Sequence, residues 1–169
     1  MTGPARGTVR VGIGYDSHAF APGGPLVLGG VRIPAETHLR GHSDGDAVAH
    51  AITDAILGAA GQGDIGTMFP DADPANAGRD SMEMLRVAAD RVRSAGWRVQ
   101  QVNVTVVAER PRIAPHRPAM CAALARALGI GAVAVSVKGK TNEGLGWIGR
   151  GEGLAALAVA TLTSTDLGG

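Results

Sequence analysis

Cysteine and aromatic residues are scarce in this chain of 169 residues, which holds one cysteine and only 3% aromatic side chains. A single cysteine excludes an intramolecular disulfide and a zinc site built from several cysteines. Cys121 lies in an apolar helical pattern, which favours a buried core thiol over a nucleophile. With few aromatics, the core must consist mainly of Ala, Val, Leu and Ile. A core of such small side chains favours additional stabilisation by assembly.

An excess of either charge is also lacking, because the formal net charge is +1. This balance gives no electrostatic support for nucleic-acid or anionic-membrane partners. The N-terminal segment has no apolar signal-peptide core, and the longest apolar run, GLAALAVATL, is about half of a membrane span. We therefore expect a soluble, cytoplasmic protein.

The hydrophobic pattern predicts strands and helices in mixed order. Strands are expected over residues 9–20, 97–108 and 132–138, with a hairpin around Gly29-Gly30. Residues 152–164 fit a strand or a helix by pattern, and the glycines at 151 and 153 and the need for a further strand partner favour a strand. Helices are expected over residues 44–60, from Asp80 (with Glu83 completing a capping box) to Gly96, and over 116–128. Glycine-rich loops are expected over residues 61–78 and 139–151.

Hairpin and crossover connections therefore occur in the same chain. They predict one α+β domain over residues 1–169, with helices on one face of a mixed sheet and residues 1–8 as a loose arm. The other face of the sheet then needs a cover. In so short a chain, a neighbouring subunit is the natural one.

Asp16 and His18 lie two residues apart on the first predicted strand, so their side chains point to the same face. An oxygen and an imidazole nitrogen can thus meet at one point. Taken alone, the pair is weak evidence for a metal site and favours structural hydrogen bonding.

The segment GHSDGDAVAH, residues 41–50, holds two histidines and two aspartates at a predicted helix start. Ser43 and Asp46 fit a capping arrangement, with Asp44 as an alternative cap, but capping does not explain His42 or His50. Asp46 and Asp54 flank His50 at a spacing of four, where a carboxylate can fix its tautomer. With Asp16 and His18, His50 would complete three protein ligands and leave a fourth position open, as in catalytic zinc sites.

The loops add possible anion-binding groups around Asp64, Gly66 and Phe69 to Asp73, and in the segment KTNEGLGWIGRGEG. No P-loop or dinucleotide-binding glycine pattern occurs, so a standard NTPase or Rossmann fold is excluded. His38 and His116 lie next to turn residues and are expected to be structural.

Four segments together carry a resemblance to a known family: GIGYDSHAF, LGGVRIP, HSDGDAVAHAITDAILGAAGQGDIGTMFPDADP and KGKTNEGLGWIGRGEG. From about residue 9 to 163 the chain resembles the 2-C-methyl-D-erythritol 2,4-cyclodiphosphate synthases. These enzymes of the non-mevalonate isoprenoid pathway convert 4-diphosphocytidyl-2-C-methyl-D-erythritol 2-phosphate to the cyclic diphosphate and CMP. The resemblance implies a homotrimer with inward-facing sheets and active sites between subunits.

The resemblance also assigns individual residues. It implies one Zn²⁺ per subunit on Asp16, His18 and His50, and Mg²⁺ or Mn²⁺ on the substrate diphosphate at Glu143. His42 and Thr141 match transition-state stabilisers. The implied substrate-binding residues are Ser43, Asp64, Gly66, Phe69, Asp71, Asp73, Ala108, Arg112, Ile113, Lys140, Thr141 and Glu143. Tyr15, Trp147 and Arg150 fall where the family lines a central cavity that sometimes holds an isoprenoid diphosphate.

The chain departs from the family at residues 112, 140 and 142. Members often have Thr where Lys140 and Asn142 stand, and Lys where Arg112 stands. At position 112, Arg keeps the charge but changes the contact geometry. Two other classes of function are compatible with the same residues. A zinc hydrolase would add water to give a linear product, and a non-catalytic metal-dependent binding protein would hold CMP without turnover.

Overall fold

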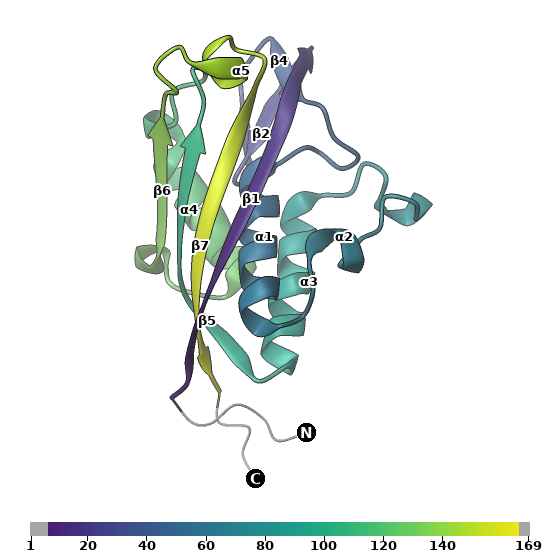
Figure 1. Ribbon diagram of the computed structural model, residues 1–169, viewed down its shortest axis with the longest axis vertical. Helices are drawn as coiled ribbons and strands as arrows, with labels where there is room; N and C mark the ends of the chain where they lie inside the picture. Colours follow the sequence, from purple (N-terminus) through teal and green to yellow (C-terminus); the bar gives the residue numbers. More distant parts are fainter. Residues whose placement is uncertain (1–6, 166–169) are drawn as a thin grey trace.

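The computed structural model describes residues 7–165, and a five-stranded mixed sheet lies at its centre (Figure 1). The strands are β1 (Val9–Pro22), β2 (Leu26–Leu28), β3 (Val31–Ile33), β4 (Thr37–Leu39), β5 (Trp97–Val107), β6 (Val135–Lys140) and β7 (Gly153–Ser164). The α-helices are α1 (Ala47–Ala60), α2 (Ile65–Met68), α3 (Ser81–Ser94), α4 (Arg117–Leu128) and α5 (Gly146–Gly149). Short 3-10 turns occur at Pro74–Asn76, Ala114–His116 and Ala132–Ala134.

The large sheet has the strand order β4-β1-β7-β5-β6. β5 and β6 run parallel, whereas the other neighbouring strands pair antiparallel. α1 packs on β1 and β7, and α4 packs on β6, with α3 beside α1 (Figure 1). The predicted α+β class with a mixed sheet is confirmed, and so is the hairpin around Gly29 and Gly30, which joins β2 to β3.

Two glycines in β1 allow α1 to lie very close to that strand. A Cβ atom added to Gly12 would lie 2.0 Å from the carbonyl oxygen of Ala55, and one added to Gly14 would lie 1.9 Å from that of Ala51. Both distances are far shorter than a van der Waals contact, so any side chain there would push the helix away. This close approach brings His50, which precedes Ala51, next to Asp16.

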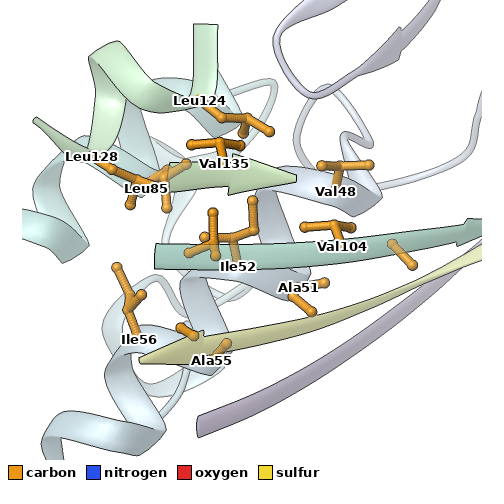
Figure 2. Close-up of a cluster of buried hydrophobic side chains, with 14 of the residues drawn as sticks. Val48, Ala51, Ile52, Ala55, Ile56, Leu85, Val104, Leu124, Leu128 and Val135 are labelled. Carbon is orange, nitrogen blue, oxygen red and sulfur yellow. The ribbon is translucent and has the colours of Figure 1, made fainter. Parts of the chain in front are cut away.

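The core lies between α1, α3, α4 and the sheet, and it is built from aliphatic side chains (Figure 2). Val48, Ile52 and Ile56 of α1, which recur at a spacing of four, are fully buried. They meet Leu85 of α3 and Val104 of β5 in the same cluster. The predicted aliphatic core is thus confirmed. Cys121 packs against this core but is only half-buried, so it is less buried than its sequence pattern predicts.

The opposite face of β1 and β7 carries large apolar side chains in solvent. Ile13 is 66% exposed, Tyr15 57% and Leu157 40%. Tyr15 pairs with Leu157 across the two strands, and Ile13 pairs with Val159, so these side chains form one continuous apolar strip. We call this strip the open face. A contiguous apolar surface of this kind is typical of a protein–protein contact.

Several predicted boundaries are wrong. The helix expected from residue 44 begins at Ala47, because Asp46 is its N-cap. The expected loop over residues 61–78 contains α2 and a 3-10 turn, and the loop over 139–151 contains α5. The strand expected at 132–138 begins at Val135, after a 3-10 turn, and extends to Lys140. Strand β4 was not predicted, because three residues are too few to show a periodic pattern.

Other expectations concern the chain's N-terminal end and the start of α3. Residues 1–6 of the expected arm lie outside the described residues, whereas the Thr8 amide donates to Ser164 Oγ at 3.2 Å and is held against β7. Asp80 caps α3 as predicted, but Glu83 pairs with Arg79 at 3.2 Å instead of completing the capping box. Within residues 7–165, the helices are too short or too polar to span a membrane.

Candidate metal centre and substrate pocket

Asp16, His18 and His50 converge at one point between β1 and α1. Asp16 Oδ2 lies 2.8 Å from His18 Nε2 and 3.0 Å from His50 Nδ1, and the two nitrogens are 3.4 Å apart. Asp16 and His18 share a strand face, as predicted, and His50 reaches them from the first turn of the helix. The three residues predicted as metal ligands are therefore brought together.

The other ring nitrogen of each histidine contacts a protein oxygen. His18 Nδ1 lies 2.6 Å from the carbonyl oxygen of Arg40, which can only accept a hydrogen bond, so Nδ1 carries the proton. His50 Nε2 lies 2.8 Å from Ser81 Oγ and 3.0 Å from Ser43 Oγ. With those nitrogens as donors, the lone pairs of His18 Nε2 and His50 Nδ1 both face Asp16.

Ser81 links His50 to a carboxylate. Its hydroxyl donates a short hydrogen bond to Asp44, and its oxygen can then accept a hydrogen bond from His50 Nε2. Ser81 is fully buried, so water does not compete for either bond. The sequence predicts a carboxylate four residues from His50 as this partner, and that prediction is wrong: Asp54 instead accepts the amide of Ile65 at 2.8 Å.

The donor set fits a divalent metal ion. In a tetrahedral site with bonds of about 2.0–2.1 Å, ligand atoms lie about 3.3 Å apart, so shifts of a few tenths of an ångström would suffice. Two lone pairs and a carboxylate oxygen otherwise face one another without a positive charge between them. The three side chains form a metal-capable cluster among the described residues, which agrees with a metal cofactor.

The pKa values of the cluster follow from its burial and from its internal contacts. Burial raises the pKa of Asp16, but hydrogen bonds and the charges of His18 and His50 more than offset this effect, so the pKa lies below its ordinary value. The hydrogen bond to Asp16 raises the pKa of His18 against the opposing effect of burial. Without a metal, the cluster therefore favours a cation, here a proton, at the point where the ligand atoms meet.

Asp46 fixes the start of α1 and thereby the position of His50. Its buried carboxylate accepts the amides of Val48 and Ala49 at 3.1 and 3.0 Å, and those of Gly29 and Gly30 at 2.8 and 2.7 Å. One side chain thus ties the helix to the β2–β3 hairpin. Burial raises the pKa of Asp46, whereas the four amide donors favour the charged form. Ser43 and Asp44, also considered as caps, face His50 and Ser81 instead.

A pocket of about 240 Å³ opens beside Asp16, His18 and His50, which we call the triad. Besides the triad, its lining includes five residues predicted from the sequence: His42, Ser43, Gly66, Phe69 and Asp71. Asn76 and Met84 also line it and were not predicted, because neither carries a signal for binding outside this geometry. The cluster of Asp16, His18 and His50 is therefore open to a small ligand on one side.

Of the residues predicted for the methylerythritol part, Asp64 and Asp73 do not line this pocket. Asp64 is exposed and caps α2 through the amide of Thr67 at 2.7 Å, and Asp73 caps the following 3-10 turn through the amide of Ala75 at 3.0 Å. The hydrogen bond from Thr67 lowers the pKa of Asp64. Both aspartates shape the loop that carries Gly66, Phe69 and Asp71.

A second group of predicted residues gathers at the ends of the parallel strands β5 and β6. The amide of Ala108 donates to the carbonyl oxygen of Lys140 at 2.8 Å, and Ile113 packs against Gly139. Thr141 Oγ1 donates to Glu143 at 2.9 Å. Arg112 lies nearby, on the lining of a cavity of about 930 Å³. The lining of the triad pocket contains none of these residues.

The three residues predicted for a central cavity lie at different places in the chain's structure. Tyr15 belongs to that face, and Trp147, on α5, is 36% exposed. Arg150 pairs with Glu152 at 2.6 Å and shares the large cavity with Arg112. Of the two histidines expected to be structural, His38 contacts the carbonyl oxygen of Gly23 at 2.7 Å, and His116 lies at the start of α4.

Comparisons with known proteins agree with this geometry. Residues 9–163 match the YgbB family. The 2-C-methyl-D-erythritol 2,4-cyclodiphosphate synthase of Gemmatimonas aurantiaca is 61% identical over 154 residues, which cover 91% of this chain and 93% of the relative. The synthase of Azoarcus sp. (strain BH72) is 55% identical over 157 residues, which cover 93% and 97%.

Solved structures are similar over nearly the whole chain. The bifunctional IspDF from Campylobacter jejuni matches with a TM-score of 0.91 and 41% identity over 95% of this chain, which spans 43% of that longer protein. The CDP complex of IspF from Plasmodium falciparum matches with a TM-score of 0.83 and 34% identity, over 96% of this chain and 100% of that one. The chain therefore belongs to the YgbB family, the family of the 2-C-methyl-D-erythritol 2,4-cyclodiphosphate synthases.

Proposed function

We propose that this chain converts 4-diphosphocytidyl-2-C-methyl-D-erythritol 2-phosphate to 2-C-methyl-D-erythritol 2,4-cyclodiphosphate and releases CMP. It would serve as a phosphorus–oxygen lyase of non-mevalonate isoprenoid synthesis. The observation that carries this proposal is the cluster of Asp16, His18 and His50 at the wall of a pocket, with both histidine lone pairs aimed at one point. The relatives named above support the substrate.

The metal at the triad would be Zn²⁺, one per subunit. Two imidazoles and one carboxylate suit zinc, and three protein ligands leave a position for substrate. When bound, the ion would supply Lewis-acid polarisation of a phosphoryl oxygen. Arg40 and Ser81 would hold the histidine tautomers needed for binding. Glu143 would contribute an oxygen ligand to Mg²⁺ or Mn²⁺ on the diphosphate.

The chain's own residues would mainly position the substrate. Its 2-phosphate, with a second pKa of about 6, is largely dianionic at neutral pH, so attack needs no strong general base. An oxygen of the 2-phosphate forms a bond to the β-phosphorus, the bond from that phosphorus to the bridging oxygen breaks, and CMP leaves with the electron pair. Holding both groups in line within one molecule is worth up to about 7–11 kcal/mol.

The roles of individual residues follow from their places in the structure. His42 and Ser43 would contact the phosphates, because they line the pocket beside the triad. Gly66, Phe69 and Asp71 would hold the methylerythritol part on the facing wall. Thr141 would stabilise the transferring phosphoryl group, and Ala108, Arg112, Ile113 and Lys140 would bind the cytidine nucleotide.

The active site would form between two copies of the chain in a homotrimer. The nucleotide residues at the ends of β5 and β6 lie outside the triad pocket, so one chain does not bring the two halves together. The open face, with Ile13 66% exposed, needs a partner surface as well. Packing three open faces together would meet both needs and would place Tyr15, Trp147 and Arg150 around a central cavity.

The decisive experiment measures CMP release and bound zinc in the same preparations. Wild-type protein should release CMP, lose this activity with a chelator and regain it with zinc. His50→Ala should lose zinc and CMP release together, whereas the control His38→Ala should keep both. A fully active, metal-free His50→Ala protein would refute the assignment. A product one water heavier than the cyclic diphosphate would indicate a hydrolase, and CMP binding without turnover would indicate a binding protein.

A further inference from the structure

A second cavity lies on the helical side of the molecule, between the β2–β3 hairpin and helices α3 and α4. Its volume is about 650 Å³, within the range of small-molecule sites. It shares no lining residue with the triad pocket. Ser81 lies between the two, because it bonds to Asp44, which lines this cavity, and to His50, which lines the other pocket.

Three arginines from three different elements line this cavity. Arg32 comes from β3, Arg86 from α3 and Arg126 from α4. Within residues 7–165, none of the three forms an ion pair, in contrast to Arg79, Arg93 and Arg150. Three guanidinium groups around one cavity repel one another unless an anion lies between them. Because the lining also contains the carboxylates of Asp44 and Asp80, the three arginines exceed them by one positive charge.

The two carboxylates of the cavity form hydrogen bonds within the chain and keep their charges. Asp44 accepts the amide of Asp46 at 3.1 Å, the amide of Ser81 at 3.2 Å and the hydroxyl of Ser81. Asp80 accepts the amides of Met82 and Glu83 at 2.8 and 3.4 Å, as the N-cap of α3. These bonds hold Asp44 to the starts of α1 and α3 and Asp80 to the start of α3. Among the described residues, neither carboxylate forms an ion pair with an arginine of the cavity, so the three guanidinium groups can bind a ligand.

We propose that this cavity binds a phosphorylated small molecule, with its phosphate oxygens on Arg32, Arg86 and Arg126. Guanidinium groups bind phosphate through paired hydrogen bonds, and several can share one phosphate or diphosphate. Val27, Met82 and Ala127 give the cavity an apolar wall, which would contact the uncharged part of the ligand. This site is separate from the proposed active site and does not depend on the function proposed for it.

Calorimetric titration of the full-length chain with inorganic pyrophosphate tests the site. An Asp16→Ala background weakens binding at the triad, and the arginine variants then identify the part of the remaining binding that belongs to the arginine-lined cavity. Arg126→Ala and Arg86→Ala should each weaken this binding about tenfold, the loss of one charge-assisted contact, and Arg126→Glu should abolish it. The control Arg93→Ala, an exposed arginine of α3 paired with Asp90, should leave it unchanged. Thermal unfolding checks that each variant is folded.

Two parallel titrations identify the chemical source of the phosphate. Adenosine monophosphate represents nucleotides, and butyl phosphate represents phosphorylated alcohols with an apolar tail. Tighter binding of butyl phosphate than of inorganic phosphate would support the apolar wall. Absence of binding tighter than about 1 mM for all probes, or equal binding by Arg126→Glu and wild type, would overturn the proposal. CMP release by Arg126→Ala should remain at the wild-type level in either case.

Discussion

The two faces of β1 and β7 are formed by alternate residues of the same strands, yet their side chains differ in size, polarity and exposure. The face toward α1 carries Gly12, Gly14, Asp16 and His18, which are small or able to bind a metal, and the helix lies directly on it. The open face carries large apolar side chains that nothing within residues 7–165 covers. Small side chains allow close approach and hence precise placement of ligands, whereas large exposed ones provide area for association.

Gly14→Val tests the helix-facing side and should have the largest effect. Its Cβ would lie 1.9 Å from the carbonyl oxygen of Ala51, which belongs to rigid helical backbone. Overpacking in a core costs about 1–3 kcal/mol and occasionally more; we expect at least the upper value here, with loss of zinc binding. Urea unfolding and zinc content measure both. Retention of wild-type stability and zinc would show that α1 does not depend on this close approach.

Ile13→Asp tests the open face. It is a neighbour of Gly14, but its side chain is 66% exposed, so a monomer should tolerate the charge. In a trimer built on this face, the aspartate would be buried without a partner, at a cost of several kcal/mol. We expect light scattering to show a shift from trimer to monomer, with the circular dichroism spectrum kept. A variant that remains trimeric would place the assembly contact elsewhere.

Much of this contrast can be predicted from the sequence, because strand alternation is strict. The Asp16-x-His18 spacing places both side chains on one face, and recurring Val48, Ile52 and Ile56 define the buried side of α1. The contacts of His50 Nε2 cannot be predicted in this way, since Ser81 is 31 residues away and carries no distinctive motif. Sequence spacing suggests Asp46 or Asp54 instead, but long-range packing commits those carboxylates to backbone amides.

Ser81→Ala tests how His50 is positioned on the helix-facing side, and it should have a smaller effect than Gly14→Val. It removes the oxygen between His50 and Asp44, so the imidazole loses one of the bonds that fix its tautomer. Removing such supporting contacts typically lowers metal affinity about 10–100-fold. Chelator competition measures the zinc affinity, and ¹⁵N NMR of the metal-free protein reports the tautomer of His50.

Ser43 Oγ also lies 3.0 Å from His50 Nε2 and can retain part of the effect, so the double variant Ser43→Ala/Ser81→Ala should lose more affinity than either single variant. Ser81→Thr should restore much of it. Unchanged zinc affinity and tautomer in the double variant would show that these hydroxyls do not position His50.

Arg10→Ala should have a smaller effect than the variants above, because Arg10 lies near the end of the contact between β1 and α1. Arg10 lies on β1 two residues before Gly12, and its guanidinium group stacks over the Trp97 ring at 4.4 Å and reaches the Ala59 carbonyl oxygen at 3.4 Å. A partly exposed cation–π contact is worth about 0.5–1 kcal/mol, so the free energy of unfolding should fall by that amount, with zinc affinity unchanged. Arg93→Ala, which breaks an exposed pair with Asp90, should change less. Loss of zinc with Arg10→Ala would mean that the end of α1 is coupled to His50 at its start, and that the helix shifts as one rigid body on β1.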